Sequence, residues 1–302
     1  MVNNNNDGHT QDPAIKPRRM SFPFQQMKAH NFFDDNSLKS SFVAALSATF
    51  PPGEGEFINS VRNYQDQITD PKLKEQIRGF VTQEAHHSHQ HKQANIAISK
   101  LGWDAKRLEV SLQAEIEKYF HRRSNRFRLA MTVGMEHLTA ILAEHVLENP
   151  YKIEPMEPAA RQLLYWHSVE EIEHKAVAFD VYMQCEGDQK YLRRALRIGF
   201  FLFALRISIY MMAMMWWAKK WPTWSEAKSF YSFLFSKEEG FMTALKKPYK
   251  DYFQPGFHPW QHANQHLIDK WKKELYNPEC DKGSDQYVKP EESSSKLETH
   301  AA

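Results

Sequence analysis

Apolar residues recur every three or four positions through most of the chain, whereas no long stretch alternates apolar and polar residues. This period predicts amphipathic helices, and the missing alternation argues against strands. Glycine, which weakens helices, occurs only 11 times in 302 residues. We therefore predict an all-α fold.

Proline and glycine mark the ends of the predicted helices. In chain order, these helices cover residues 37–48, 53–70, 71–101, 111–149 and 159–186. The Phe50-Pro-Pro-Gly53 stretch is predicted to stop the first helix, because proline cannot donate a helical hydrogen bond. Pro71 suits the first turn of the third helix. The fourth is either one long helix or a pair of helices.

Composition changes towards both ends of the chain. Residues 1–20 are polar and include a basic Lys16-Pro-Arg-Arg19 run, which predicts a disordered arm. Residues 277–302 are also polar and are predicted to form a disordered tail. Between them, we expect residues 21–276 to form a single helical domain. Its last part, after Pro222, is dense in proline and aromatic residues, which predicts an ordered irregular segment on the bundle.

Two of the predicted helices contain the same motif, Glu-x-x-His. The residues that share one helix face are Glu84, His87 and His91 on the first of them, and His167, Glu171 and His174 on the second. An i, i+3 pair aims a carboxylate and an imidazole at one spot. Two such motifs on two helices are half of the ligand set of a carboxylate-bridged dimetal site. The other half would be one Glu from each of two further helices.

Two glutamates meet that requirement. Glu54 falls on the apolar face of its predicted helix, whereas Glu56 falls on the polar face, so Glu54 is the better inward carboxylate. Glu136 lies within an apolar stripe whose neighbours are small residues, and Glu144 is the second choice. A buried carboxylate in such a stripe needs a cation or a hydrogen-bond donor.

The positions of these polar residues also have explanations that need no metal. Glu54 and Glu56 open a predicted helix, where acidic residues favour the helix dipole. A single buried histidine is more often a satisfied core residue, but three polar groups on one apolar stripe reverse that expectation. Glu170 and Glu173 are predicted to lie off the metal face. Surface or packing roles are expected for three more histidines at helical spacing, His258, His262 and His266.

One apolar segment, residues 198–218, is long enough to span a bilayer. Arginines precede it, Lys219-Lys220-Trp221 follows it, and Arg206 alone interrupts it. Tryptophan and basic residues at the ends resemble interface anchors, whereas Arg206 would need a partner inside a membrane. We weigh three interpretations, in order of preference: a core helix, a helix lying in the plane of the membrane, and a true span.

Charge and cysteine content indicate which partners and which cellular compartment to expect. Lys and Arg number 39 and Asp and Glu 37, so charge suggests no nucleic-acid partner. The two cysteines, Cys185 and Cys280, have no metal-like spacing and suggest no disulfide scaffold. The first residues include no apolar run, so we expect no secretory signal. These features favour a cytoplasmic protein, and residues 198–218 could bring it to the inner face of the membrane. Oligomeric state is not indicated.

The motifs together resemble known families. The order Glu54, Glu84-x-x-His87, Glu136, Glu171-x-x-His174 resembles the ligand order of ferritin-like di-iron carboxylate proteins. Most of residues 20–275 resembles the bacterial family labelled predicted metal-dependent hydrolases, through Phe50-Pro-Pro-Gly-Glu54, the Gln83–His91 run and Pro255-Gly-Phe-His-Pro-Trp260. The helix with His167, Glu171 and His174 is similar to the last metal-binding helix of p-aminobenzoate N-oxygenases, where an extra histidine joins the di-iron site.

The resemblance implies a ferritin-like four-helix bundle with additional helices, together with iron and O₂ chemistry. We expect a non-haem dimetal oxygenase or oxidase, with iron as the metal or manganese as the alternative. Glu84 and Glu171 would bridge the metals, and the remaining expected ligands are Glu54, Glu136, His87, His167 and His174. His91 is an addition to the simplest ferritin-like ligand pattern. It would be either a metal ligand or a hydrogen-bond donor to a ligand. Expected partners are a small apolar or amphipathic substrate, O₂ and an electron donor. The alternatives are a dimetal hydrolase and an iron-binding or storage protein.

Overall fold

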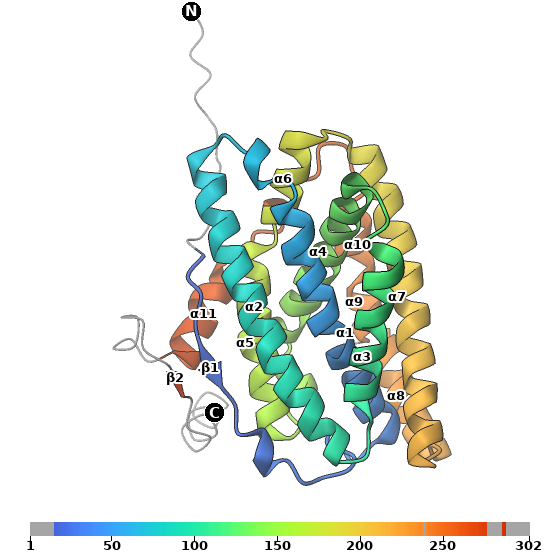
Figure 1. The fold of residues 1–302 in the computed structure, drawn as a ribbon. Coiled ribbons are helices and arrows are strands. Elements are labelled where there is room, and N and C mark those ends of the chain that lie inside the picture. The colour runs from blue at the N-terminus through green and yellow to red at the C-terminus, as the bar shows by residue number, and fades with distance from the viewer. Residues whose placement is uncertain (1–14, 238–239, 277–285, 288–302) are drawn as a thin grey trace, which may run out of the picture.

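The computed structural model of the protein describes residues 15–237, 240–276 and 286–287, and it confirms the all-α fold (Figure 1). In chain order, the α-helices are α1 (Ser37–Arg62), α2 (Pro71–Lys100), α3 (Ala105–Glu115), α4 (Asn125–Glu148), α5 (Pro158–His174), α6 (Val177–Cys185), α7 (Gln189–Ala218), α8 (Trp224–Phe235), α9 (Phe241–Ala244), α10 (Lys246–Asp251) and α11 (Gln265–Leu275). Single turns of 3-10 helix lie at Phe24–Gln26, Gln65–Gln67, Pro150–Lys152 and Pro259–Gln261, and Ile116–Phe120 forms a π-helical turn. The two-residue strands β1 (Met20–Ser21) and β2 (Gln286–Tyr287) pair in parallel.

The four helices that carry the predicted ligands pack lengthwise against one another (Figure 1). Helix α1 packs against α2 and α4, and α5 packs against the same two helices. Their buried apolar side chains form two separate clusters: along α2, Ile77 and Phe80 belong to one and Ala94 and Ile98 to the other. The turns between them contain Glu84 and other buried polar residues. A polar layer therefore divides the core midway along the bundle.

The prediction that Phe50-Pro-Pro-Gly53 ends a helix is wrong, because α1 continues through Pro51 and Pro52. Pro51 cannot donate the helical hydrogen bond to the carbonyl of Ser47. That carbonyl instead accepts a hydrogen bond from Asn95 Nδ2 on α2, at 3.1 Å. A side chain of the neighbouring helix thus satisfies a group that proline leaves without its donor.

Two other predicted helices are interrupted. Residues 111–149 belong to a pair of helices, and Ser124 caps the second of them by accepting a backbone hydrogen bond from the first turn of α4. The predicted helix over residues 159–186 is broken between His174 and Val177, which separates α5 from α6.

The ends of the domain also differ from the prediction. Residues 15–20, expected to be disordered, lie against the bundle, where Arg18 NH1 donates to Glu173 at 3.3 Å and Met20–Ser21 forms β1. The segment after Pro222 is not irregular but contains helices α8 to α11. The rest of the predicted arm, and the predicted tail except residues 286–287, lie outside the described residues.

Helix α7 contains the apolar segment 198–218 and lies at the outer edge of the bundle, along α4 and α1 (Figure 1). Within the described residues, α7 alone is long and apolar enough to cross a bilayer by length and composition. One of its faces is buried, with Leu196, Ile207 and Met214 at 0–5% exposure. The opposite face is exposed.

Candidate metal centre

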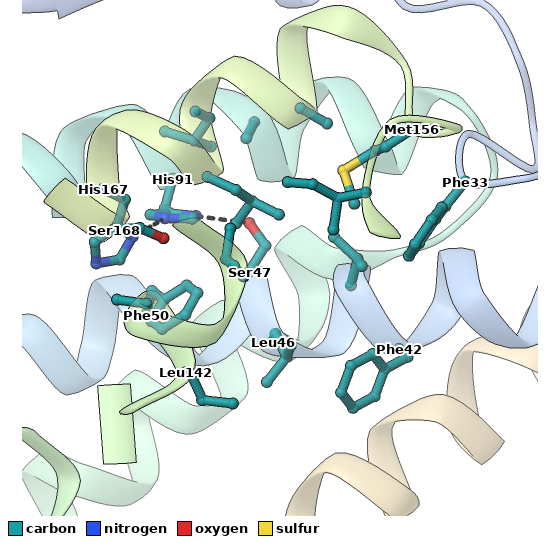
Figure 2. Close-up of a pocket in the computed structure, with 18 of the residues that line it drawn as sticks. Phe33, Phe42, Leu46, Ser47, Phe50, His91, Leu142, Met156, His167 and Ser168 are labelled. Atoms are coloured by element: carbon teal, nitrogen blue, oxygen red, sulfur yellow. Dashed lines mark hydrogen bonds between the residues drawn. The ribbon is translucent and has the colours of Figure 1, made fainter. Parts of the chain in front are cut away.

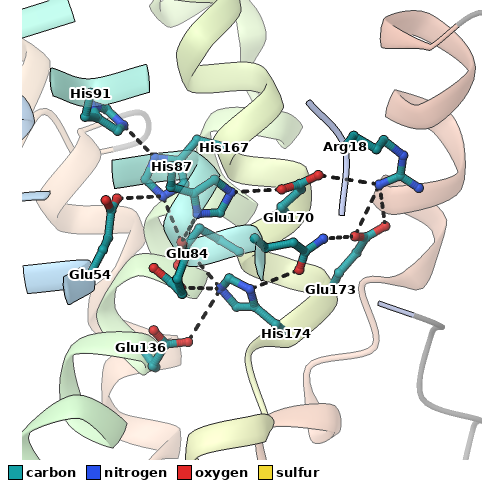
Figure 3. A network of polar contacts seen from close by, with 12 residues as sticks. Arg18, Glu54, Glu84, His87, His91, Glu136, His167, Glu170, Glu173 and His174 are labelled. Atoms are coloured by element: carbon teal, nitrogen blue, oxygen red, sulfur yellow. Dashed lines mark hydrogen bonds and ion pairs between the residues drawn. The ribbon is translucent and has the colours of Figure 1, made fainter. Parts of the chain in front are cut away.

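The polar layer brings together side chains from four helices (Figure 3). Each candidate ligand is at most 4% exposed. Helix α1 contributes Glu54, α2 contributes Glu84 and His87, α4 contributes Glu136, and α5 contributes His167, Glu171 and His174. The residues predicted from their spacing therefore converge on one buried site.

The ligand atoms fall into two groups, within each of which all atoms lie within 4.8 Å of one another. These groups are Glu54, His87 and His167, and Glu84, Glu171 and His174. Glu171 Oε1 lies between the groups, 2.8 Å from His167 Nε2, 3.5 Å from His174 Nε2 and 3.6 Å from His87 Nδ1. Glu136 Oε2 lies 3.6 Å from His174 Nε2. The arrangement offers two adjacent ion sites with Glu171 between them.

The carboxylates of the cluster lack the partners that buried charges need. Neither carboxyl oxygen of Glu54, Glu84 or Glu136 has a hydrogen-bond donor among the described residues. Burial, followed by neighbouring carboxylates, raises the pKa of all three well above the usual range of a glutamate. Burial also opposes the charge of Glu171, but His174 and His167 outweigh it and hold its pKa well below the usual range.

Divalent cations fit this donor set. Carboxyl oxygens and imidazole nitrogens are the ligands that iron, manganese and zinc accept in proteins. The site-facing atoms His87 Nδ1 and His174 Nε2 have no hydrogen-bond partner among the described residues, like the carboxyl oxygens beside them. Four buried carboxylates and these free nitrogens would be costly to bury without positive charge. Two divalent cations would supply it.

A second layer of side chains orients two of the imidazoles from behind. His87 Nε2 lies 3.1 Å from Glu170 Oε2, and His174 Nδ1 lies 3.2 Å from Gln83 Oε1. Gln83 Nε2 in turn donates to Glu173 Oε2 at 2.7 Å. With those outer nitrogens protonated, the lone pairs of His87 Nδ1 and His174 Nε2 face the cluster. Such outer partners fix the tautomer and raise the basicity of a metal-binding histidine.

Glu170 and Glu173 were expected off the metal face, and they do not face the cluster. They are nevertheless completely or almost completely buried, at 0% and 2% exposure, and they contact the residues that do. Arg18 lies 3.3 Å from Glu173 and 3.7 Å from Glu170, and Lys272 on α11 also pairs with Glu173, so these two cations offset the carboxylates. Periodicity on one helix could not reveal this layer, because its partners come from α2, from α11 and from residues before α1.

His91 lies behind His167 and outside both groups of ligand atoms. Its Nε2 is 2.8 Å from His167 Nδ1, and its Nδ1 is 3.0 Å from Ser47 Oγ. Ser47 donates its proton to Asn95 Oδ1 at 2.7 Å, so Ser47 Oγ accepts from His91 Nδ1. His91 Nε2 must then accept from His167 Nδ1. This relay leaves the lone pair of His167 Nε2 facing the cluster and places His91 behind that candidate ligand.

Other acidic and imidazole residues have separate partners. Glu56 is buried rather than on a polar face, and Arg128 Nε and NH2 donate to its two oxygens at 2.6 and 2.9 Å. Glu144 lies away from the cluster, 3.9 Å from His262. His258 pairs with Asp180 at 2.9 Å. These contacts leave Glu54 and Glu136 as the helix carboxylates that face the two groups.

Two cavities border the cluster on different sides. The first, of about 90 Å³, is enclosed largely by apolar side chains and reaches His167 and Glu171 (Figure 2). The second, of about 370 Å³, reaches Glu54 and extends between α1, α4 and α7. Phe50, Thr139 and Leu142 line both cavities. Both cavities therefore present apolar walls to the site, and the second has the volume of a small-molecule pocket, which is about 300–1,000 Å³.

Comparison of the sequence with models of known protein families identifies the family of this chain. A model described as predicted metal-dependent hydrolase matches residues 16–263, so the chain belongs to that family. No curated protein and no solved structure matches the chain. The family and the two buried histidine and glutamate groups together indicate a metal-dependent enzyme.

Proposed function

We propose that this member of the predicted metal-dependent hydrolase family is a dimetal oxidoreductase that uses O₂ to oxidise an apolar or amphipathic small molecule. The observation that carries the proposal is the donor set. Four buried carboxylates and three imidazoles converge from four helices, and apolar cavities border them. The expected resemblance to ferritin-like di-iron proteins and to p-aminobenzoate N-oxygenases supports the same chemistry.

We assign the ligands by their positions. Glu171 would bridge the two ions, because its Oε1 lies close to all three imidazoles. Glu84 is the second proposed bridge, Glu54 and Glu136 are terminal ligands, and the histidines bind through the nitrogens that face the cluster. When bound, two iron ions would supply the electrons and the coordination positions for O₂.

The protein contributes the surroundings of the reaction. The outer hydrogen bonds of His87 and His174 hold both rings in the tautomer that presents a lone pair to the cluster. The apolar walls of the cavities exclude water, which protects reactive oxygen species from side reactions. Phe50 lines both cavities at the edge of the site and would help to orient a substrate in either.

A dimetal hydrolase is the second candidate, and the family description favours it. In that case a metal-bound water would attack an ester or amide. The two functions need the same ligands but differ in their need for O₂. The apolar lining of the cavities favours oxidation, because an apolar substrate offers few bonds that water can cleave.

The test is O₂ uptake by the metal-loaded protein. The metal-free protein is loaded anaerobically with Fe(II), mixed with oxygenated buffer and followed with an oxygen electrode and by visible absorption. We expect uptake in proportion to bound iron, and its loss in Glu171→Ala. Glu154→Ala is the matched control, because Glu154 is exposed and pairs with Arg161 away from the site.

Two results would contradict the proposal. In the first, Fe(II)-loaded wild-type protein takes up no more O₂ than the Glu171→Ala variant mixed with the same amount of iron. The second is metal-dependent cleavage of a p-nitrophenyl ester that proceeds equally well without O₂, which would establish the hydrolase instead. Loading far beyond two irons per chain would favour storage.

A further inference from the structure

The outer face of α7 carries a continuous apolar stripe. Its residues recur at spacings of three and four, which places them on one side of the helix. They are 46–69% exposed: Ile198, Phe201, Leu202, Leu205, Ile209, Met212 and Trp216. Eighteen residue steps at 1.5 Å each make the stripe about 27 Å long. Large apolar surfaces of this kind mark interaction sites.

Basic and aromatic residues lie at the two ends of this stripe. Arg194 and Arg197 are exposed one turn before Ile198 and Phe201, and Lys219 and Lys220 are exposed just after Trp216. Helix α7 itself contains no acidic residue. At the same end as the lysines, Trp221 is 62% exposed and its ring lies 6.2 Å from that of Trp216. Trp224, at the start of α8, is 87% exposed.

This composition matches the headgroup region of an anionic bilayer. Amphipathic helices that lie in the membrane plane bury an apolar face and place Lys and Arg among anionic headgroups, with Trp at the boundary. A second copy of the chain fits less well. In either orientation of two paired α7 stripes, the basic residues at the ends of one helix would face basic residues of the other. A span is also disfavoured, because the inner face of α7 is packed on α4 and α1.

The larger cavity connects this surface with the metal centre. Leu202 belongs to the stripe and also lines the cavity of about 370 Å³, whose lining at the other end includes Glu54. This volume lies within the range of small-molecule pockets, about 300–1,000 Å³. The π-helical turn Ile116–Phe120 forms part of its wall, and such turns are frequent at functional sites.

Charged groups lie at the rim of the cavity beside the apolar stripe. Arg206 lines the cavity but pairs at 2.7 Å with Glu115 on α3, which lines it too, so the positive charge at the rim comes from the exposed Arg123 in the loop before α4. Tyr119 is 56% exposed at the same rim. An amphiphile with an anionic head and an apolar chain could therefore place its head at the rim and its chain inside.

We propose that the α7 stripe docks in the plane of an anionic membrane and that the adjoining cavity admits the apolar chain of a membrane lipid to the metal centre. The docking surface does not depend on the reaction. The choice of substrate class, a lipid chain, rests on the proposed function. The proposal explains why α7, which packs against the bundle on one side only, also lines the substrate cavity.

Docking is tested by flotation of the full chain with vesicles, with and without one-third phosphatidylglycerol in phosphatidylcholine. We expect binding to the anionic vesicles, weaker binding to the neutral ones, and quenching of tryptophan fluorescence by lipids brominated near the headgroup. The double variant Phe201→Asp, Met212→Asp should bind roughly tenfold more weakly or worse, since two exposed apolar side chains that would enter the bilayer are replaced by anions. Ile96→Asp is the control, because Ile96 is an exposed apolar residue of α2, 39% accessible.

The cavity is tested with a matched pair of glycines on α1. Gly53 lines the cavity and Gly55 does not, and a Cβ at either position meets no atom within 4 Å. Gly53→Leu should fill the cavity and reduce binding of a fluorescent polyene fatty acid at least tenfold, without changing metal content or vesicle flotation. Gly55→Leu should bind the fatty acid like the wild type.

Each outcome bears on the proposal. Wild-type protein that does not float with anionic vesicles, or a double variant that floats as well as the wild type, would overturn the docking. So would a stable dimer that the same double variant converts to monomers, which would identify the stripe as a self-interface. Equal fatty-acid binding by Gly53→Leu would overturn the cavity assignment. Failure of O₂ uptake alone, with flotation and fatty-acid binding intact, would refute only the proposed function.

Discussion

Glu54 and Glu56 lie two residues apart on α1 and are both buried, at 2% and 5% exposure, yet their surroundings differ in kind. Glu56 accepts two charged hydrogen bonds from Arg128, whereas neither oxygen of Glu54 has a donor among the described residues. We predict that the effect of Glu54→Gln on stability depends on metal, whereas the effect of Glu56→Gln does not. The comparison separates a metal ligand from a structural ion pair.

The magnitudes follow from these contacts. Glu56→Gln leaves the guanidinium of Arg128, only 9% exposed, without its counter-charge. Removing one partner of a buried pair costs about 3–5 kcal/mol, and the remaining amide oxygen places the estimate near the lower end. In the metal-free protein, Glu54→Gln removes a carboxyl group whose pKa is raised by burial and by Glu171, so it should cost nothing or stabilise slightly. With metal at 100 times the wild-type Kd, complete loss of binding would lower the unfolding free energy by about 2.7 kcal/mol.

The assay is urea unfolding followed by circular dichroism, once with a chelator and once with Fe(II) under anaerobic conditions. Glu56→Gln should lose stability equally in both, and Glu54→Gln only with metal. Metal content after gel filtration should fall for Glu54→Gln alone. If Glu54→Gln is as destabilising as Glu56→Gln in the presence of chelator, the carboxylate of Glu54 has a structural partner and the ligand assignment is wrong.

Three further predictions concern residues around the site. His167→Ala should lose one metal and shift the visible absorption of the oxidised protein while the fold survives; unchanged metal content would make His167 a packed neighbour. Glu170→Gln should weaken metal binding about 10- to 100-fold, because Glu170 orients His87 from behind, and titration with Fe(II) against exposed Glu154→Gln checks this. Burial, followed by Lys152, lowers the pKa of His145 to about 4 from 6.5. The unfolded chain then accepts a proton that the folded protein resists, so stability should fall as pH drops below about 6.5, and less steeply for His145→Phe in urea titrations.

Spacing along single helices was enough to predict the residues that converge on the site. Glu84 and His87 are one turn apart, so any helix through them aims both at the same spot. The choice of Glu54 over Glu56 followed from its apolar neighbours, and the structure does place Glu54 in the cluster. The same periodicity missed that Glu56 is buried too. A cation on another helix, Arg128, permits that burial, and no pattern within α1 could indicate it.

The errors in the fold have a similar origin. Two consecutive prolines end most helices, and where α1 continues past them the amide of Asn95 on α2 supplies the hydrogen bond that Pro51 cannot donate. The second layer behind the histidines depends likewise on contacts between distant segments: Gln83 joins His174 to Glu173, and Arg18 reaches the same carboxylate from before α1. Local sequence therefore indicates which side chains face the candidate metal centre, whereas tertiary contacts decide how they are held.

The apolar segment 198–218 shows the limit of hydropathy most clearly. Length and composition could not distinguish a core helix from one in the membrane plane, because both need apolar residues along α7. The distinction lies in which face is covered, and only the structure reveals that the inner face of α7 packs on α4 while the side chains of the outer stripe stay 46–69% exposed. A core helix would need a second covering layer, and the cations at both ends oppose a second copy of the stripe. A bilayer supplies an apolar cover and anionic headgroups together.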